Sequence, residues 1–248
     1  MTATIKSGGG LILYDETLVD QPDARLFAPA YWDGQGASQP TADGRGASWI
    51  IAHADGDWVL RHYRRGGAVR FLDDRYGWPG RVARTRPWRE WRYLSEMCAR
   101  GLPVARPVAA QVRRSGLIWR GDLITLRIED ARPLSAWLKA RDLAAPPWRD
   151  IGRTLAQFHA AGAAHPDLNA HNILIQPDDA VHLIDFDRGG WQTPGGAWAQ
   201  QNLARFRRSL VKLTDEAAAA EIWPALMAGY AENPPPAPPS PLRGQRGG

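Results

Sequence analysis

The sequence is 248 residues long, 44% apolar and 23% charged, with a net charge of +5. This length allows one large domain or a two-lobed unit, and the composition excludes a chain that is disordered over most of its length. The single cysteine, Cys98, excludes an intrachain disulfide and a zinc cluster held by thiolates. The positive charge favours an anionic partner, which includes phosphate, nucleic acid and an acidic membrane surface.

The N-terminal residues lack the apolar core of a signal peptide. No stretch of the chain approaches the ~20 apolar residues that a membrane-spanning helix needs. We therefore expect a cytoplasmic protein whose contact with any membrane is peripheral.

The first half of the chain predicts strands and one helix. Its first 40 residues are mixed, with short apolar runs only. Residues 43–51 contain a glycine turn that leads into a strand, and residues 57–63 predict a second strand. Residues 87–99 predict a helix, with proline in its first turn and Gly101 just beyond its end. Residues 123–128 are a short strand candidate.

The second half predicts helices and one strand. Apolar residues at helical spacing mark a helix over 148–158, for which Gly162 is the stop signal. The apolar segment 181–186 predicts a strand, and a second helix is predicted over 203–213. The tail, residues 233–248, consists largely of proline and glycine and is expected to be disordered.

The most specific pattern is His165-Pro-Asp-Leu-Asn-Ala-His-Asn-Ile-Leu, followed by Leu183-Ile-Asp-Phe-Asp. An Asp, an Asn five residues later and a second Asp after an apolar strand are typical of kinase catalytic loops. Phosphoryl transfer needs a carboxylate at the substrate hydroxyl, here Asp167. It also needs oxygen ligands for Mg²⁺ at the ATP phosphates, here Asn172 and Asp185. The alternative is a turn whose carboxylates cap helices, which either segment alone allows.

Residues before this loop supply candidates for nucleotide binding. Arg61 lies on the strand predicted over 57–63, where kinases usually carry a lysine, and Val59 shares its face. Glu90, on the predicted helix, is the candidate carboxylate to pair with Arg61. Gly44 and Gly46 lie in the turn one strand earlier, where backbone amides can approach phosphates, although an ordinary hairpin explains them equally well.

Several blocks together resemble the 3-deoxy-D-manno-octulosonic acid (Kdo) kinase family of lipopolysaccharide synthesis. Besides the catalytic loop, they are Arg61-His-Tyr-Arg-Arg-Gly-Gly, Arg89-Glu-Trp, Gly101-Leu-Pro-Val, Ile184-Asp-Phe-Asp-Arg-Gly and Asn202-Leu-Ala-Arg-Phe-Arg-Arg-Ser-Leu. The resemblance implies ATP-dependent phosphorylation of the Kdo 4-hydroxyl on a Kdo-bearing lipid A precursor, Kdo-lipid IVA. It also implies peripheral attachment to the cytoplasmic face of the inner membrane.

The expected fold is α+β and two-lobed, like that of protein kinases. Residues 1–128 would form the N-terminal region and a sheet-rich nucleotide-binding lobe, and residues 129–232 a mainly helical catalytic lobe. The nucleotide would lie beneath the Gly44–Gly46 turn, with residues 126–128 as the linker between lobes.

The stretch from residue 61 to residue 92 holds ten arginines against three carboxylates. Charge runs of this kind are usually solvated. Because the implied substrate carries sugar carboxylates and lipid phosphates, we expect Arg64, Arg65 and Arg70 to help bind the acidic glycolipid. The tryptophans nearby, Trp78 among them, are expected to pack, although a lipid headgroup or a nucleic-acid base is an alternative partner.

Three positions depart from the protein-kinase pattern. Pro166 replaces the arginine that reads activation-loop phosphorylation, which argues against phospho-regulated protein kinase activity. Asn169 replaces a catalytic-loop lysine, so another group is expected to supply that cation. Asp187 follows Asp-Phe in place of glycine and is expected to pair with Arg188 rather than to bind metal.

Two alternatives to a Kdo kinase remain open. One is a kinase for a different small molecule, of aminoglycoside or choline type, and the other is a catalytically silent kinase-like binding module. A nucleic-acid partner is not expected, since no recognised nucleic-acid motif accompanies the basic charge.

Overall fold

The structure is a computed structural model that describes residues 1–40, 48–63 and 76–233. It divides into two compact units. Unit 1 comprises Met1–Asp130 together with Phe186–Arg188, and unit 2 comprises Ala131–Asp185 and the chain from Gly189 onward. Antiparallel sheet dominates the first unit and helices dominate the second, so the predicted α+β class is confirmed.

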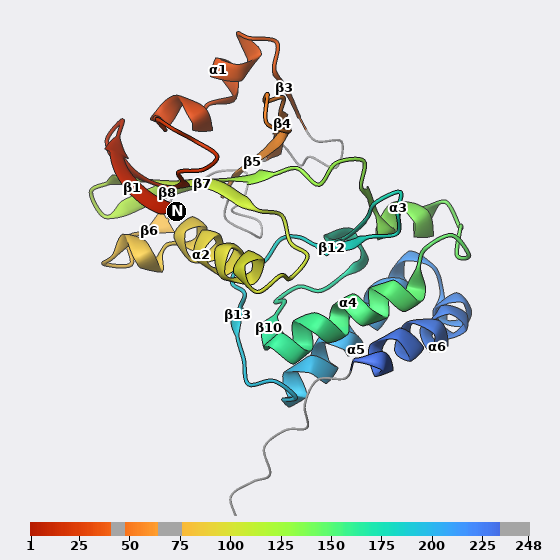
Figure 1. Cartoon of the computed structure of the whole chain (residues 1–248). Helices are drawn as coiled ribbons and strands as arrows, with labels where there is room; N and C mark the ends of the chain where they lie inside the picture. The colour runs from red at the N-terminus through yellow and green to blue at the C-terminus, as the bar shows by residue number, and fades with distance from the viewer. Residues whose placement is uncertain (41–47, 64–75, 234–248) are drawn as a thin grey trace, which may run out of the picture. The chain divides into compact units, whose positions relative to one another are not determined.

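Unit 1 is built on one antiparallel sheet in the order β1-β2-β7-β8-β5-β4-β3, with β6 paired to β8 (Figure 1). The strands are β1 (Thr2–Ser7), β2 (Gly10–Asp15), β3 (Ser38–Pro40), β4 (Ser48–Ile51), β5 (Trp58–His62), β6 (Tyr76–Gly77), β7 (Pro107–Ser115) and β8 (Ile118–Leu126). The strand predicted over 57–63 is β5, and the candidate at 123–128 is the end of a longer strand, β8.

The β1–β2 hairpin did not emerge from the sequence pattern. Its turn residues, Gly8 and Gly9, have φ angles of +55° and +75°. Two positive φ angles in a two-residue loop match the twist of the flanking strands, and glycine adopts them without steric cost. The outer strand β1 is mostly exposed and polar, so it lacks the apolar alternation that identifies a strand.

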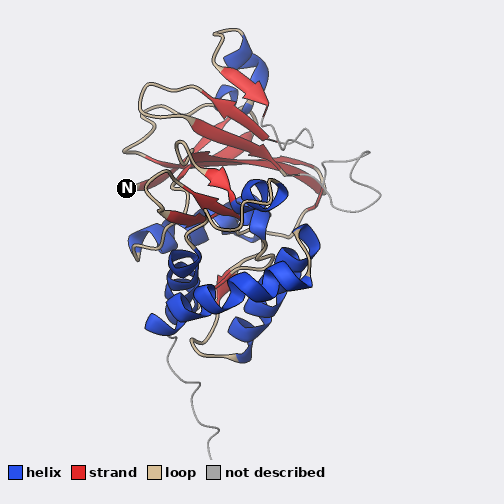
Figure 2. Cartoon of the chain, turned by 90° about the vertical axis from the view of Figure 1, so that its right-hand side faces the viewer, coloured by secondary structure: helices blue, strands red, loops and turns tan. Residues whose placement is uncertain are grey.

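Helical segments lie on both faces of this sheet (Figures 1 and 2). Helix α2 (Arg86–Ala99) contacts β7 and β8 and matches the helix predicted over 87–99. A buried cluster joins the sheet to η1 (Ala24–Phe27) and α1 (Pro29–Asp33), and η3 (Val82–Arg84) precedes α2. The cluster comprises Ile12, Phe27, Trp32, Ile51, Trp58, Leu60, Val108, Ala109 and Ile124.

Unit 2 contains α3 (Leu134–Lys139), α4 (Trp148–Ala161), α5 (Ala197–Leu213) and α6 (Glu216–Glu232). A small antiparallel sheet has the order β12-β11-β9, and β10 pairs with β13. These strands are β9 (Arg132–Pro133), β10 (Ala163–Ala164), β11 (Ile173–Ile175), β12 (Val181–Leu183) and β13 (Gly190–Trp191). A short 3-10 turn, η4 (Ala170–Asn172), precedes β11.

The sequence predicted most of these elements. Helix α4 ends at Gly162, whose φ of +77° provides the expected left-handed cap. Strand β12 lies within the predicted 181–186 segment, and α5 begins earlier than the predicted 203. Helix α6 was missed, because its run of small apolar residues has no clear helical period. The expected tail lies outside the described residues beyond Asn233.

No helix in the described part of the chain is long and apolar enough to cross a membrane.

Helix α6 packs along α4 at very short range. A Cβ atom added at Gly229 would lie 1.9 Å from the carbonyl oxygen of Arg149, and one at Gly152 would lie 2.0 Å from that of Leu226. The two glycines therefore allow the helix backbones to touch.

Replacing Gly229 by alanine is expected to destabilise the protein by about 2 kcal/mol or more, because a backbone carbonyl cannot move aside as a side chain can. Urea unfolding would measure the loss. Gly190→Ala is the matched control, since its Cβ would meet nothing within 4 Å. Equal effects of the two substitutions would contradict this account of the α4–α6 contact.

Stability is also expected to fall in mild acid because of His159. Its Nδ1 lies 2.8 Å from the Tyr230 hydroxyl, and burial lowers its pKa from 6.5 to about 4. Between pH 6.5 and pH 4, His159 is therefore protonated in the unfolded chain but neutral in the folded protein. Its contribution to the free energy of unfolding is full above pH 6.5 and is lost as the pH falls toward 4.

Between pH 7.5 and pH 4.5 this single group should account for about 2 to 3 kcal/mol of the free energy of unfolding. Urea titrations of the wild type and His159→Gln at both pH values would isolate its share. If the two proteins lost equal stability in acid, His159 would not be the buried neutral group described here.

Candidate active site

The predicted catalytic loop lies in unit 2, between β10 and η4. His165 is 2% exposed, and its Nε2 lies 2.9 Å from the Ile184 carbonyl oxygen. Its Nδ1 accepts a hydrogen bond from the Asp167 backbone amide at 3.1 Å. Burial lowers the pKa of His165, which favours a neutral ring that donates through one nitrogen and accepts through the other. His165 therefore supports the backbone of the loop.

Two asparagine side chains fix the position of Asp167. Asn169 donates to the Asp167 carbonyl oxygen at 2.9 Å and to its carboxylate at 3.3 Å. Asn172 donates its amide nitrogen to the same carbonyl oxygen at 3.0 Å. The Asp167 side chain itself remains 67% exposed. The arrangement presents a held carboxylate to solvent, where a substrate hydroxyl can approach.

Helix α5 holds this loop from a second side. Asn202 donates to the His165 carbonyl oxygen at 3.0 Å, and Ser209 accepts from the Ala170 amide at 3.0 Å. Between them on the helix, Arg205 lies 3.3 Å from the Asp167 carboxylate. Positions 202, 205 and 209 share one face of a helix, which is why three side chains reach one loop.

Arg205 provides a cation beside Asp167 from another element and is therefore the candidate for the cation that Asn169 does not supply. Sequence reasoning placed Arg205 on a helix without giving it a role. The available signal was its position within the Asn202–Leu210 block. No spacing rule connects that block to residue 167, so only the folded chain shows the contact.

Asp185 follows the β11–β12 hairpin. Strand register pairs Ile173 with Leu183, and the Ile184 amide then donates to the Asn172 carbonyl oxygen at 3.0 Å. Asn172 and the residue before Asp185 are therefore neighbours across one ladder. Asp185 has a φ of +64°, an uncommon conformation for a residue with a Cβ.

The side-chain oxygen atoms of Asn172 and Asp185 are suitable ligands for a magnesium ion. Asn172 uses its amide nitrogen for Asp167, so its amide oxygen is available as a ligand, and Asp185 adds a carboxylate. These are hard oxygen donors, which Mg²⁺ prefers together with phosphate oxygens and water. Two protein ligands would leave the remaining positions of the octahedral Mg²⁺ shell to nucleotide phosphate oxygens and water.

Unit 1 carries the predicted pair of Arg61 and Glu90. Glu90, on α2, is 3% exposed and forms an ion pair with Arg61 on β5. Tyr63 also donates its hydroxyl to Glu90 and accepts from Arg61 at 3.2 Å. Burial, followed by the charge of Glu90, raises the pKa of Tyr63, so this hydroxyl remains a donor. Tyr63 was not singled out from the sequence.

Strand alternation places Arg61 as expected. Trp58 and Leu60 are buried in the core cluster, whereas Val59 and Arg61 belong to the opposite face and are only partly buried. Val59 pairs with Thr125 of β8, and β8 ends at Leu126, the first residue of the expected linker.

Asp187 does not pair with Arg188, so that expectation was wrong. It forms an ion pair with Arg86 of α2, whose Nε lies 2.9 Å from the carboxylate. The preceding Phe186 is fully buried, with its ring 5.8 Å from that of Tyr93 on the same helix. Arg86 lies 101 positions away in the sequence, so spacing favoured the adjacent arginine, whereas α2 brings the distant one into contact.

Five of the predicted site residues lie outside the described residues. They are Gly44, Gly46, Arg64, Arg65 and Arg70. Their roles in binding nucleotide and glycolipid stay predictions. Of the tryptophans near the arginine-rich stretch, Trp88 and Trp91 are buried, as expected for packing.

Comparison with known proteins agrees with these features. The model of the lipopolysaccharide kinase (Kdo/WaaP) family matches residues 29–230. A 3-deoxy-D-manno-octulosonic acid kinase of Xanthomonas campestris pv. campestris (strain B100) is 45% identical over 207 residues, which cover 83% of this chain and 82% of the relative. An enzyme of the same name from Xylella fastidiosa (strain M12) is 41% identical over 208 residues, 84% of this chain and 82% of the relative.

A solved structure shares the fold. It is titled "WaaP in complex with acyl carrier protein" and aligns with a TM-score of 0.53 over 86% of this chain and 88% of that chain. At 16% identity this likeness concerns the fold alone. It supports the kinase-like α+β class predicted from the catalytic loop.

The match to the family model and the identity to the two named relatives each extend over most of the chain. They agree with a loop in which an exposed aspartate is held beside hard oxygen ligands. The chain therefore belongs to the lipopolysaccharide kinase (Kdo/WaaP) family and is a kinase, a phosphotransferase.

Proposed function

We propose that this kinase transfers the γ-phosphoryl group of ATP to the 4-hydroxyl of Kdo on Kdo-lipid IVA, in the synthesis of the lipopolysaccharide core. The proposal extends the names of its relatives, which are Kdo kinases at 41–45% identity. The observation that carries the transfer step is Asp167, whose exposed carboxylate is contacted by Asn169 and Arg205 and whose backbone carbonyl oxygen accepts from Asn172. Peripheral attachment to the cytoplasmic face of the inner membrane belongs to the same proposal.

Asp167 would accept or orient the proton of the acceptor hydroxyl. Its backbone is fixed by both asparagines, so the carboxylate is presented in a defined position before substrate arrives. Arg205 lies beside this carboxylate and would stabilise negative charge on the transferred group.

Asn172 and Asp185 would hold Mg²⁺ against the nucleotide phosphates. The ion supplies positive charge that offsets the charge developing on the phosphoryl oxygens. Asn172 has a second task, since its amide nitrogen binds the Asp167 backbone. One side chain thereby couples the position of the proposed base to that of the proposed metal ligand.

In unit 1, Arg61 would bind an ATP phosphate. Its guanidinium is aligned by Glu90 and by the Tyr63 hydroxyl, so little side-chain freedom remains to be lost on binding. Val59 shares its face of β5 and would contact the nucleotide. Arginine in place of lysine offers a planar pair of donors, which suits phosphate oxygens.

The direct test is radiolabel transfer from ATP with Mg²⁺ to Kdo-lipid IVA. Asp167→Asn keeps the shape of the side chain but removes its charge, so kcat should fall by about 10²- to 10⁴-fold with the melting temperature unchanged. Asp178→Asn, an exposed loop position in the same unit, is the control and should retain activity.

Near-normal transfer by Asp167→Asn would remove Asp167 from the mechanism. Wild-type transfer to another sugar or alcohol, with none to the Kdo acceptor, would refute the proposed substrate. ATP binding without transfer or hydrolysis would favour the silent binding module.

Arg205 gives a separate prediction. Arg205→Gln should lower kcat about tenfold, a discounted value for a half-exposed cation, while the KM for ATP changes little. Arg205→Lys should restore part of kcat because the charge returns. Arg208→Gln, exposed on the same helix, is the matched control. If Arg205→Gln and Arg208→Gln had equal kcat values, Arg205 would have no role beside Asp167.

A further inference from the structure

One end of the unit 1 sheet gathers two turns and a short strand. The β1–β2 turn lies there, because Gly10 just after it pairs with Arg113 near the end of β7. The β7–β8 turn, Gly116–Leu117, closes the same end. The Trp78 amide, directly after β6, donates to the Leu117 carbonyl oxygen at 2.7 Å. We call this end the basic tip and define it by Lys6, Trp78, Arg113, Arg114 and Leu117.

The segments that run through the basic tip carry positive charge, and the first carboxylates that follow them in the chain are Asp15, Glu90 and Asp122. Residues 1–14, 76–89 and 107–121 contain no Asp or Glu. Their cations are Lys6, Arg81, Arg84, Arg86, Arg89, Arg113, Arg114 and Arg120. Carboxylates from elsewhere reach some of these cations, for example Arg113, which lies 3.4 Å from Asp122, and Arg86, which pairs with Asp187. No carboxylate of the described residues lies within ion-pair distance of Lys6 or Arg114.

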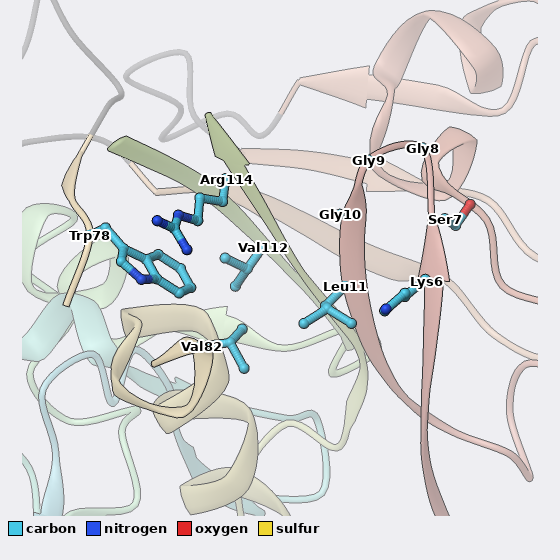
Figure 3. Close-up of a pocket in the computed structure, with 10 residues that line it drawn as sticks. All are labelled: Lys6, Ser7, Gly8, Gly9, Gly10, Leu11, Trp78, Val82, Val112 and Arg114. Carbon is cyan, nitrogen blue, oxygen red and sulfur yellow. The ribbon is translucent and has the colours of Figure 1, made fainter. Parts of the chain in front are cut away.

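A pocket of about 510 Å³ lies beside these cations. In Figure 3 the apolar side chains of Leu11 and Val112 lie between Lys6 on one side and Arg114 with Trp78 on the other. The Arg114 guanidinium lies 4.6 Å from the centre of the Trp78 ring, and its Nε donates to the Gly116 carbonyl oxygen at 2.8 Å. The pocket thus offers two cations around an apolar floor, a size and lining suited to one small group.

Leu117 adds an exposed apolar side chain to the basic tip. It is 81% exposed at the turn between β7 and β8, next to Gly116 with a φ of +59°. The other exposed large apolar residues of the described chain include Ile5, which precedes Lys6 on β1. A single exposed leucine is ordinary by itself, but Leu117 lies beside the cations of the basic tip and its carbonyl oxygen accepts from the Trp78 amide. At this place its side chain is available to an apolar environment outside the protein.

We propose that the basic tip docks onto an anionic lipid surface, with a lipid phosphate group in the pocket between Lys6 and Arg114 and with Leu117 in the headgroup region. Cations attract such a surface, and an apolar side chain beside a partly exposed tryptophan suits the boundary between headgroups and acyl chains. The proposal rests on the proposed function, which requires a lipid acceptor. The new element of the proposal is the protein surface that contacts the membrane. Part of this surface, the β1–β2 hairpin, precedes residue 29, at which the match to the family model begins.

The test is co-sedimentation of the full chain with vesicles of phosphatidylcholine, with and without phosphatidylglycerol. Wild-type protein should bind the anionic vesicles and bind the neutral ones weakly. Each cation should strengthen binding to anionic vesicles about fivefold, so the double variant Lys6→Gln/Arg114→Gln should bind them at least tenfold more weakly. Leu117→Ser should weaken it about tenfold through the lost apolar contact. All these positions lie at the surface, and thermal unfolding would verify that each variant is folded.

The matched control is Arg208→Gln/Lys212→Gln, which removes the same charge from exposed positions of α5. It should bind anionic vesicles as the wild type does. Equal weakening by both double variants would overturn the proposal, since attraction would then depend on net charge alone. Competition by inorganic phosphate, with no effect of Leu117→Ser, would assign the pocket to free phosphate instead. Tight binding of a single-stranded oligonucleotide, lost in Lys6→Gln/Arg114→Gln while vesicle binding persists, would assign it to nucleic acid.

Vesicle binding requires no catalysis, so this result is independent of the acceptor assay. With the acceptor dispersed in detergent, Lys6→Gln/Arg114→Gln should keep the wild-type kcat. The same variant should lose transfer to acceptor embedded in anionic vesicles, in proportion to its lost binding. A lower kcat in detergent would overturn the assignment of these residues to membrane docking.

Discussion

The hydrogen bond from the Asn172 amide to the Asp167 carbonyl oxygen is the contact on which the candidate active site depends. It fixes the main chain of the proposed base and, by using the amide nitrogen, leaves the amide oxygen for a cation. The same residue accepts the Ile184 amide through its backbone, directly before Asp185. The three groups to which we assign roles in phosphoryl transfer, Asp167, Asn172 and Asp185, thus belong to one short stretch of connected backbone within unit 2. His165 is part of the same network through the Ile184 carbonyl oxygen.

A different constraint governs unit 1, where a carboxylate is almost completely buried. Glu90 at 3% exposure would be costly without partners, and Arg61 and Tyr63 provide them. Their geometry fixes the guanidinium on β5. The same helix forms an ion pair with Asp187 through Arg86, so α2 holds both the proposed phosphate-binding arginine and the segment that follows Asp185. The Arg61–Glu90 and Arg86–Asp187 ion pairs stabilise a single arrangement of α2, because breaking either pair would leave a buried or partly buried charge without its partner.

The basic tip combines the charge of unit 1 with exposed apolar surface. The net charge of +5 indicated an anionic partner but gave no location. In the structure, the turns of two hairpins bring Lys6 and Arg114 to one pocket although 108 positions separate them. The arginines singled out from the sequence, Arg64, Arg65 and Arg70, lie outside the described residues, so the structure directs attention to a second set of cations.

The sequence alone determined the chemistry and most of the elements. The order and spacing of Asp167, Asn172 and Asp185 predict a catalytic loop, because chemistry fixes residue types at positions that are local in the chain. Helical and strand periods located α2, α4 and β5 for the same reason, since apolar spacing is a local property. Tertiary structure alone decided the contacts made over long separations. Arg205 beside Asp167, Arg86 on Asp187 and the polar β1–β2 hairpin arise from packing between distant segments, and no local pattern encodes which cation a carboxylate will meet.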